Sequence, residues 1–274
     1  MAHFAQSPSF ILHQVTCQFA TGDILFGPLN LSLDASVCAL VGRNGSGKTR
    51  LLRLLAGVDE PASGHIERFG THVYVAQQQD ISADTTLAEL LGYDAIFAAR
   101  TRIDSGHYEP DDLDTLDGYW DLAERLSQAF IAAKLPPFDP SKRAAELSGG
   151  ERIRALLCSA FTADADYLLL DEPTNHLDRQ GRKWFYEQLS RYQGGVLVAS
   201  HDRELLAQVP RILDLSALGL RSYGGNYADY RTQRDAEQLA ARAALEHAAT
   251  ERKRTRARMH KEHDDSLRRS AKTL

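Results

Sequence analysis

Cysteine is scarce in this chain of 274 residues, and its three cysteines, Cys17, Cys38 and Cys158, stand far apart. They form no CxxC pair, so the sequence indicates neither a disulfide framework nor a zinc site of that type. The chain has no apolar run near the roughly 20 residues that cross a membrane. No basic stretch leads into an apolar one at its start, so no signal peptide is visible. We therefore expect a cytoplasmic protein that folds without disulfides.

Acidic and basic side chains are divided unevenly along the chain, although its net charge is only −5. Residues 231–274 carry 12 Lys or Arg and 7 Asp or Glu, whereas the first 230 residues carry 20 basic and 30 acidic side chains. The body therefore has a charge of −10 and the final segment a charge of +5. A basic segment on an acidic body points to a polyanionic partner at that end.

Strand patterns alternate with helical ones over the first 225 residues, which predicts an α/β fold with a parallel sheet. Continuous apolar runs, typical of strands buried on both faces, occur at Val37–Val41, 167–170 and 196–199. Further short strand patterns occur at 10–19, 29–33 and 73–76. Helical spacing occurs at 49–56, over most of 85–135 and at 148–161. Beyond residue 225 Gly and Pro are absent, so 226–274 is predicted to be one long charged helix.

Residues 42–49, GRNGSGKT, match the phosphate-binding pattern GxxxxGK[ST], also called Walker A. Its glycines let backbone N–H groups wrap a phosphate, and the N-terminus of the following helix adds partial positive charge. Lys48 would reach the β- and γ-phosphates, and the Thr49 hydroxyl would hold Mg²⁺. Because the loop falls between an expected buried strand and an expected helix, we favour a nucleotide site over a flexible glycine turn.

Two acids end the apolar strand expected at 167–170. Asp171 could bind Mg²⁺ through water beside the phosphate loop, and Glu172 is placed to polarise a water that attacks the γ-phosphate. His201 follows the strand expected at 196–199 and could sense the γ-phosphate. Position alone leaves open that the acids face solvent and that the histidine is an ordinary surface residue.

Several further motifs resemble those of ATP-binding-cassette (ABC) ATPases. LSGGE at 147–151 is similar to the signature loop of that family, and Gln77 to its Q-loop glutamine. Asp178 lies in a D-loop-like LD pair, and His201 resembles the switch histidine. Phe19 falls where the family stacks an aromatic ring on adenine. The resemblance implies a P-loop NTPase fold, the ABC cassette, with a mixed sheet core and a helical signature subdomain, followed here by a long charged helix.

Two finer features resemble the ABC-F branch of the family. DEPTNHLD at 171–178 is similar to the sequence typical of that branch, and YGGNYADY at 223–230 resembles the GNYxxY that ends its cassette before a linker. ABC-F proteins carry two cassettes joined by a long charged helical linker and have no membrane domain. Characterised members act on ribosomes. The resemblance extends over about residues 10–274.

The same resemblance implies a domain organisation. Residues 1–225 would form an ABC cassette, with 80–160 approximately as an inserted helical subdomain, and 226–274 would begin the interdomain linker. A second cassette is missing, and we expect it either in the remainder of a longer protein or in a homodimer mate. Only 69 residues separate Gln77 from Leu147, so any arm insertion of the family type is short or absent.

In the ABC-F interpretation the chain binds and hydrolyses ATP with Mg²⁺, and nucleotide-gated closure of a cassette dimer acts on the ribosome. The catalytic residues would be Lys48, Gln77, Glu172 and His201, and the metal would be held by Thr49, Gln77 and Asp171. The nucleotide would be bound by Phe19, Gly42, Arg43, Asn44, Gly45, Ser46, Gly47, Lys48, Thr49, Arg50, Ser148, Gly149 and Gly150. At Arg50 many relatives have a second threonine. Ser148 and Gly150 would cap ATP held by the opposite cassette, so the chain alone would hydrolyse ATP slowly.

The basic helix 251–269 would contact ribosomal or transfer RNA through phosphates, with an affinity that falls steeply with salt. A solvated charged helix, or one arm of a helical hairpin, is the alternative. Three other functions stay open: the ATPase subunit of an ABC membrane transporter, a DNA-associated ABC ATPase, and a nucleotide-binding module without useful turnover. Three features favour the ABC-F interpretation: the NHLD sequence, the GNYxxY-like end of the cassette and the basic helix. The presence of both Glu172 and His201 argues against a nucleotide-binding module without useful turnover.

Overall fold

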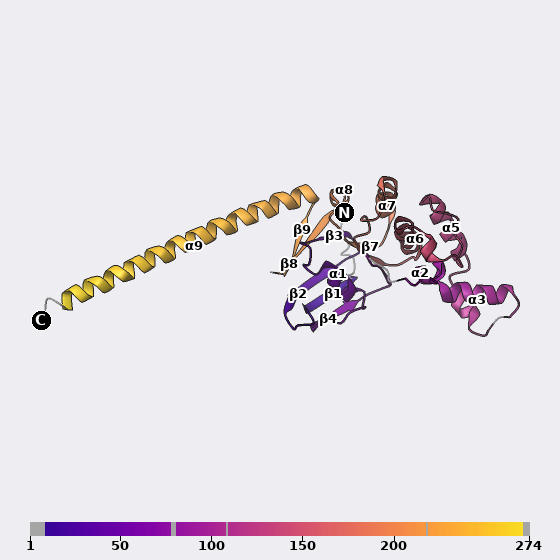
Figure 1. The fold of residues 1–274 in the computed structure, drawn as a ribbon, viewed down its shortest axis with the longest axis horizontal. Coiled ribbons are helices and arrows are strands. Elements are labelled where there is room, and N and C mark those ends of the chain that lie inside the picture. Colours follow the sequence, from indigo (N-terminus) through magenta and orange to yellow (C-terminus); the bar gives the residue numbers. More distant parts are fainter. Residues whose placement is uncertain (1–8, 78–80, 108, 218, 271–274) are drawn as a thin grey trace, which may run out of the picture. The chain divides into compact units, whose positions relative to one another are not determined.

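The structure, a computed structural model, describes residues 9–77, 81–107, 109–217 and 219–270. The chain divides into two compact units, the first ending at Asn226 and the second beginning at Tyr227. Among the described residues, all strands belong to the first unit, and the second is a single helix (Figure 1).

A six-stranded sheet forms the centre of the first unit. Its strands are β3 (Val37–Val41), β5 (His72–Val75), β6 (Tyr167–Asp171), β7 (Gly195–Ala199), β8 (Arg211–Ser216) and β9 (Gly219–Gly224). They lie in the order β5-β6-β7-β3-β8-β9, all parallel except β9, which pairs antiparallel with β8. The central strands β6 and β7 are buried along their whole length, as the continuous apolar runs predict.

The N-terminal part of the chain forms a second, antiparallel sheet. Its strands are β1 (Phe10–Gln18), β2 (Ile24–Leu33) and β4 (Ser63–Arg68), in the order β2-β1-β4. A tight turn joins β1 to β2, with the Phe19 amide donating to the Asp23 carbonyl at 2.9 Å. The register of β1 shifts near Gln14, whose φ of 52° is left-handed, and this bulge disturbs the pairing on both sides of the strand.

Helix α1 (Lys48–Leu55) ties the two sheets together. Its four leucines, at 51, 52, 54 and 55, are all buried. One cluster of buried apolar side chains contains residues of α1 together with residues of β1, β2, β3, β6, β7 and β8. The packing holds the start of α1, and the loop that leads into it, at the carboxyl end of β3.

The chain between β5 and β6 is helical. Its elements are α2 (Leu87–Leu91), α3 (Asp94–Asp104), α4 (Asp112–Leu116), α5 (Leu122–Ala132), a 3₁₀ turn (Ala144–Glu146) and α6 (Gly149–Thr162). Phe97, Phe130 and Phe138 form an aromatic row with ring centroids 5.5 and 5.2 Å apart. Two more helices, α7 (Arg179–Arg191) and α8 (Arg203–Leu206), follow β6 and β7 respectively.

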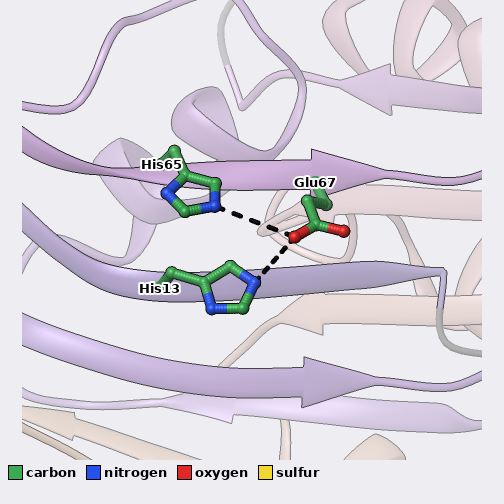
Figure 2. Close-up of side chains that lie close together, drawn as sticks. All are labelled: His13, His65 and Glu67. Carbon is green, nitrogen blue, oxygen red and sulfur yellow. Dashed lines mark hydrogen bonds and ion pairs between the residues drawn. The ribbon is translucent and has the colours of Figure 1, made fainter.

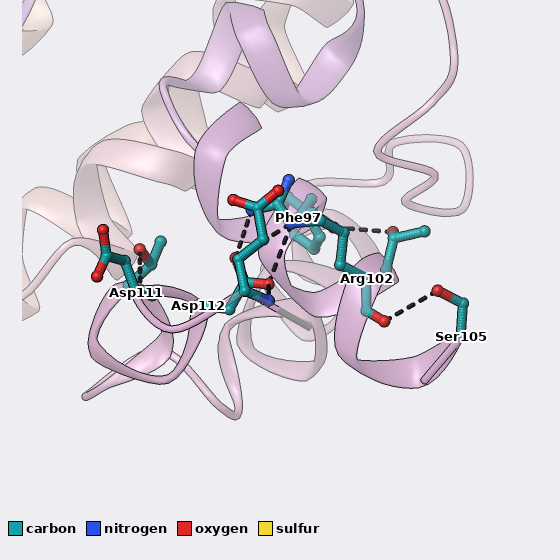
Figure 3. A network of polar contacts seen from close by, with 8 residues as sticks. Phe97, Arg102, Ser105, Asp111 and Asp112 are labelled. Atoms are coloured by element: carbon teal, nitrogen blue, oxygen red, sulfur yellow. Dashed lines mark hydrogen bonds and ion pairs between the residues drawn. The ribbon is translucent and has the colours of Figure 1, made fainter. Parts of the chain in front are cut away.

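An ion pair fastens α4 onto the end of α3 (Figure 3). The Asp112 carboxylate, only 3% exposed, accepts from the Arg102 guanidinium and from the Glu109 amide at 2.8 Å. The hydrogen bonds from Arg102 hold the pKa of Asp112 below its ordinary value, with the Glu109 amide acting in the same direction. The two short helices are therefore joined by a charged contact in which a buried acid is fully compensated.

The second unit is helix α9 (Tyr227–Ser270), 44 residues long. It shows almost no segregation of apolar from polar positions, as expected for a helix whose sequence is polar all round. Within the described part of the chain, no helix combines the length and apolar character needed to cross a membrane.

Candidate functional site

The loop 42–49 wraps between β3 and the first turn of α1, and its shape requires glycine at particular positions. Gly47, the residue before the helix, has a φ of 99°, and a Cβ placed there would lie 2.7 Å from the Phe26 ring. A Cβ on Gly42 would lie 2.5 Å from the Leu215 carbonyl oxygen of β8. The backbone of the loop therefore lies too close to its neighbours for any larger residue at these two places.

Lys48, the first residue of α1, points back into the loop. Its Nζ donates to the Gly42 carbonyl at 3.2 Å and lies 3.0 Å from Nε2 of His201. Burial lowers the pKa of His201, and the positive charge of Lys48 lowers it further. The lowered pKa favours the neutral imidazole, whose Nε2 can accept a hydrogen bond from Lys48 Nζ.

Asp171 ends β6 as a buried carboxylate without a hydrogen-bond partner on either oxygen. Burial raises its pKa, while the nearby Thr49 hydroxyl and the charge of Lys48 oppose the shift. An unpaired buried carboxylate is costly unless a cation satisfies it. The hydroxyl of Thr49, the amide oxygen of Gln77 and this carboxylate form an all-oxygen donor set, the kind that Mg²⁺ prefers, so the residues fit a magnesium site.

Glu172 follows immediately in a strained backbone conformation. Its φ of 49° is left-handed, which is unfavourable for a residue with a side chain, and its amide donates to the Ala199 carbonyl of β7 at 2.9 Å. The side chain is 9% exposed, and its Oε1 lies 3.5 Å from Nε2 of His201. Burial is the largest cause of its raised pKa; Lys48 opposes the shift and Asp171 adds to it.

These side chains line one pocket of about 720 Å³, large enough for a nucleotide. Of the residues singled out from the sequence, its lining contains Phe19, Asn44, Gly45, Gly47, Lys48, Thr49, Arg50, Gln77, Asp171, Glu172 and His201. Four further lining residues, Gln18, Ala20, Leu25 and Asn175, are not predicted from the sequence. Asn175 lies within the DEPTN motif and could have been found there, whereas nothing in the sequence marks the other three.

The sequence motifs do not predict the surroundings of two pocket residues, Phe19 and Arg50. Phe19, at the tight turn between β1 and β2, is 51% exposed. Arg50 lines the pocket, but its guanidinium is bound to Asp59 at 2.6 Å. Arg53 holds the other side of the same carboxylate at 2.8 Å. The Arg50 charge is thus already compensated within the chain.

Gly42, Arg43 and Ser46 belong to the loop without lining the pocket. Ser148, Gly149 and Gly150 also lie outside its lining, at the N-terminus of α6. There the Ser148 hydroxyl accepts from the Glu151 amide at 3.3 Å, and the Glu151 carboxylate accepts from the Ser148 amide at 2.8 Å. A Cβ on Gly150 would lie 2.8 Å from the His176 carbonyl oxygen, which brings the signature-like loop against the segment that follows Glu172.

The phosphate loop after β3, the two acids at the end of β6 and the glycine-led helix α6 define an ABC-type ATP-binding cassette. The profile of the family described as "ABC transporter" matches residues 27–175. The chain belongs to this family.

Curated relatives narrow the comparison. The "Energy-dependent translational throttle protein EttA" of Mycobacterium tuberculosis (strain H37Rv) is 36% identical over 225 residues, which cover 73% of this chain and 39% of that protein. EttA of Escherichia coli (strain K12) is 33% identical over 235 residues, which cover 76% of this chain and 41% of that protein. EttA is an ABC-F protein, so the predicted resemblance to that branch is confirmed. The chain spans about two fifths of the length of these relatives.

Solved structures agree on the fold. An ATP-binding subunit of an ABC transporter superposes with a TM-score of 0.63 at 18% identity, covering 82% of this chain and 93% of its own. A dimeric ATP-binding cassette with ADP and Pi, in a post-hydrolysis state, superposes with a TM-score of 0.62 at 20% identity. The match covers 78% of this chain and 98% of that chain. The predicted ABC cassette fold is therefore confirmed.

Proposed function

We propose that this chain is the ATP-binding and ATP-hydrolysing cassette of an ABC-F protein that acts on the ribosome in the cytoplasm. The observation that carries the proposal is the pocket, where the phosphate-loop lysine, a buried unpaired carboxylate and a buried glutamate with raised pKa converge. The translational role rests on the EttA relatives. Residues 1–225 would be the cassette, with 80–160 approximately as its helical subdomain, and 226–274 would begin the interdomain linker.

The pocket residues would have different roles in phosphoryl transfer, which depends on positioning the reacting groups and neutralising the charge of the phosphates. Lys48 and the loop amides would bind the phosphates. Glu172, whose raised pKa brings it nearer to a useful base at neutral pH, would take a proton from the attacking water. His201 would hold the geometry at the γ-phosphate. Mg²⁺, held by Thr49, Gln77 and Asp171, would supply positive charge to the phosphate oxygens.

The substitution Glu172→Gln tests the assignment of the base. It keeps the size of the side chain and removes the proton acceptor, so we expect ATP turnover to fall by roughly 10²–10⁴-fold. ATP binding, measured by equilibrium dialysis of labelled nucleotide, should persist. Glu187→Gln, on the outer surface of α7, is the matched control and should turn over ATP like the parent chain. Normal turnover in Glu172→Gln would remove this residue from the role.

Ribosome binding is tested by sedimentation of the chain with ribosomes across a salt series. If the basic segment contacts RNA phosphates, replacing Arg252, Lys253, Arg254 and Arg256 with glutamine weakens binding and makes its salt dependence shallower. Replacing Arg231, Arg234 and Arg242, which lie earlier in the same helix, is compared with replacing only Arg252, Lys253 and Arg254; this charge-matched control should weaken binding much less.

The same assay separates the ribosomal role from that of a DNA-associated ATPase. Duplex DNA that displaces ribosomes completely at equal phosphate concentration would favour a DNA-associated ATPase. No sedimentation with ribosomes at low salt would contradict the ribosomal role and leave the ATPase assignment standing on the Glu172→Gln result.

A further inference from the structure

A compact group of two histidines and one glutamate lies outside the nucleotide pocket, on the antiparallel sheet. His13 comes from the middle strand β1, and His65 and Glu67 come from the edge strand β4. Figure 2 shows both imidazoles turned toward the same carboxylate oxygen. Nε2 of His13 lies 2.9 Å from Oε1 of Glu67, and Nε2 of His65 lies 3.7 Å from it.

The backbone aims these three side chains at one point. His13 and His65 are direct cross-strand partners, so their side chains leave the sheet on the same face. Glu67 is two residues beyond His65 on the same strand, which places it on that face as well. The bulge at Gln14 and the close approach of Gly64, where a Cβ would lie 2.4 Å from the His13 carbonyl oxygen, fix the pairing at this place. Bulges commonly re-aim a neighbouring side chain in this way.

The spacing of the three donor atoms is close to that of a metal site. All three lie within 4.8 Å of one another. Ligand atoms about 2.0–2.1 Å from a tetrahedral zinc ion are about 3.3 Å apart, so adjustments of roughly 1 Å in the side chains would complete the site. The imidazole rings are stacked, with their centroids 4.5 Å apart and an interplanar angle of 16°, so both rings already lie side by side next to the Glu67 carboxylate.

We propose that His13, His65 and Glu67 bind a divalent transition-metal ion of the zinc class. Two imidazole nitrogens and one carboxylate oxygen are a ligand set that zinc accepts with its fourth position open to water. The side chains are 43, 67 and 45% exposed, so solvent and the ion reach the site directly. The ion links edge strand β4 to β1 and stands apart from the ATP chemistry, so the site does not depend on the proposed function.

Titration of the nucleotide-free chain with Zn²⁺ and with Co²⁺ tests the site. We compare the parent chain with His13→Ala, His65→Ala and Glu67→Ala, and use His107→Ala, an exposed histidine of the helical segment, as the matched control. The parent and His107→Ala should bind one more zinc ion by calorimetry than each of the other three, or bind it at least about tenfold more tightly. Excess Mg²⁺ should not displace the ion, because an imidazole-rich site favours zinc over magnesium.

Cobalt and heat provide two independent readouts. The parent chain and His107→Ala should give the intense visible absorption of tetrahedral Co²⁺, and His13→Ala, His65→Ala and Glu67→Ala should not. Zn²⁺ should raise the melting temperature of the parent and leave those three variants unchanged. Equal zinc stoichiometry and affinity in all five chains, or a cobalt spectrum that survives in all three site variants, would overturn the proposal.

Discussion

The Asp59 carboxylate is held in place by two arginines, Arg53 and the pocket residue Arg50. The hydrogen bonds from Arg53, followed by those from Arg50, lower the pKa of its carboxyl to about 2. Because the carboxylate is favoured in the folded state, its contribution to stability is present above the ordinary value of 3.8 and is lost as the pH falls toward 2. Both arginines are partly exposed, and screening by solvent limits the contribution to about 1 kcal/mol.

The substitution Asp59→Asn should therefore lower the free energy of unfolding by about 1 kcal/mol at pH 7. The difference from the parent should shrink as the pH is lowered from 4 toward 2, because both chains then carry an uncharged group. Urea unfolding at several pH values measures it. Asp104→Asn, which breaks an exposed i,i+4 pair with Arg100, is the control and should change stability by less than about 0.5 kcal/mol. A difference for Asp59→Asn that does not change with pH would contradict the linkage.

Part of the site could be predicted from the residues alone. Lys48, Thr49, Asp171 and Glu172 stand in motifs whose spacing reflects strand-loop-helix geometry, and the structure places them in one pocket. The sequence predicts both Lys48 and His201 near the γ-phosphate, but not the direct contact between these two side chains, which lie 153 positions apart in the chain. The left-handed φ of Glu172 was equally hidden, because a glutamate carries no local signal for that conformation.

At the scale of elements, two helices begin with the same capping box, and the ABC-F interpretation assigns only one of them, α6, to a nucleotide site. Thr86 caps α2 and Ser148 caps α6, each accepting from the amide of a glutamate three residues later. Replacing either with alanine should cost about 1 kcal/mol of stability. If Ser148 also caps ATP across a composite site, Ser148→Ala should reduce ATP turnover as well, whereas Thr86→Ala should not.

Chemical denaturation and steady-state ATPase assays on the two variants separate these effects. The stability loss common to both reports the helix cap, and any additional loss of turnover in Ser148→Ala reports the nucleotide. Equal turnover in the two variants at matched stability would confine Ser148 to a structural role.

Strands with continuous apolar runs could be predicted from the sequence, whereas β4, β8, β9 and the helices α7 and α8 were not predicted. The expected strand at Val37–Val41 is β3, and the expected runs at 167–170 and 196–199 lie within β6 and β7, because a strand buried on both faces is apolar throughout. Strand β4 was missed because Ile66 is its one apolar residue and its pairing comes from β1 alone. Helix α7 was missed although Phe185 and Leu189 lie four residues apart on its buried side, a signal that was available.

At the scale of the whole molecule, the separation of Ser148 and Gly150 from the pocket makes the oligomeric state measurable through activity. If these residues complete the site of another cassette, turnover per chain should rise with protein concentration as pairs of chains form. ATPase rates measured from nanomolar to micromolar protein, with mass determined by light scattering at each concentration, test this. Constant full turnover by monomeric chain across the range would show that one cassette suffices.

Helix α9 has a mechanical consequence that follows from its length alone. At 1.5 Å per residue its 44 residues extend about 66 Å. If it remains straight, a rotation of about 5° at its base moves the far end by about 6 Å, more than one helical turn. A small rotation at its first residues, which leaves the fold unchanged, would thus displace the other end of the helix. The displacement would be comparable to the spacing between neighbouring phosphates of a nucleic acid. In that sense the helix would act as a lever.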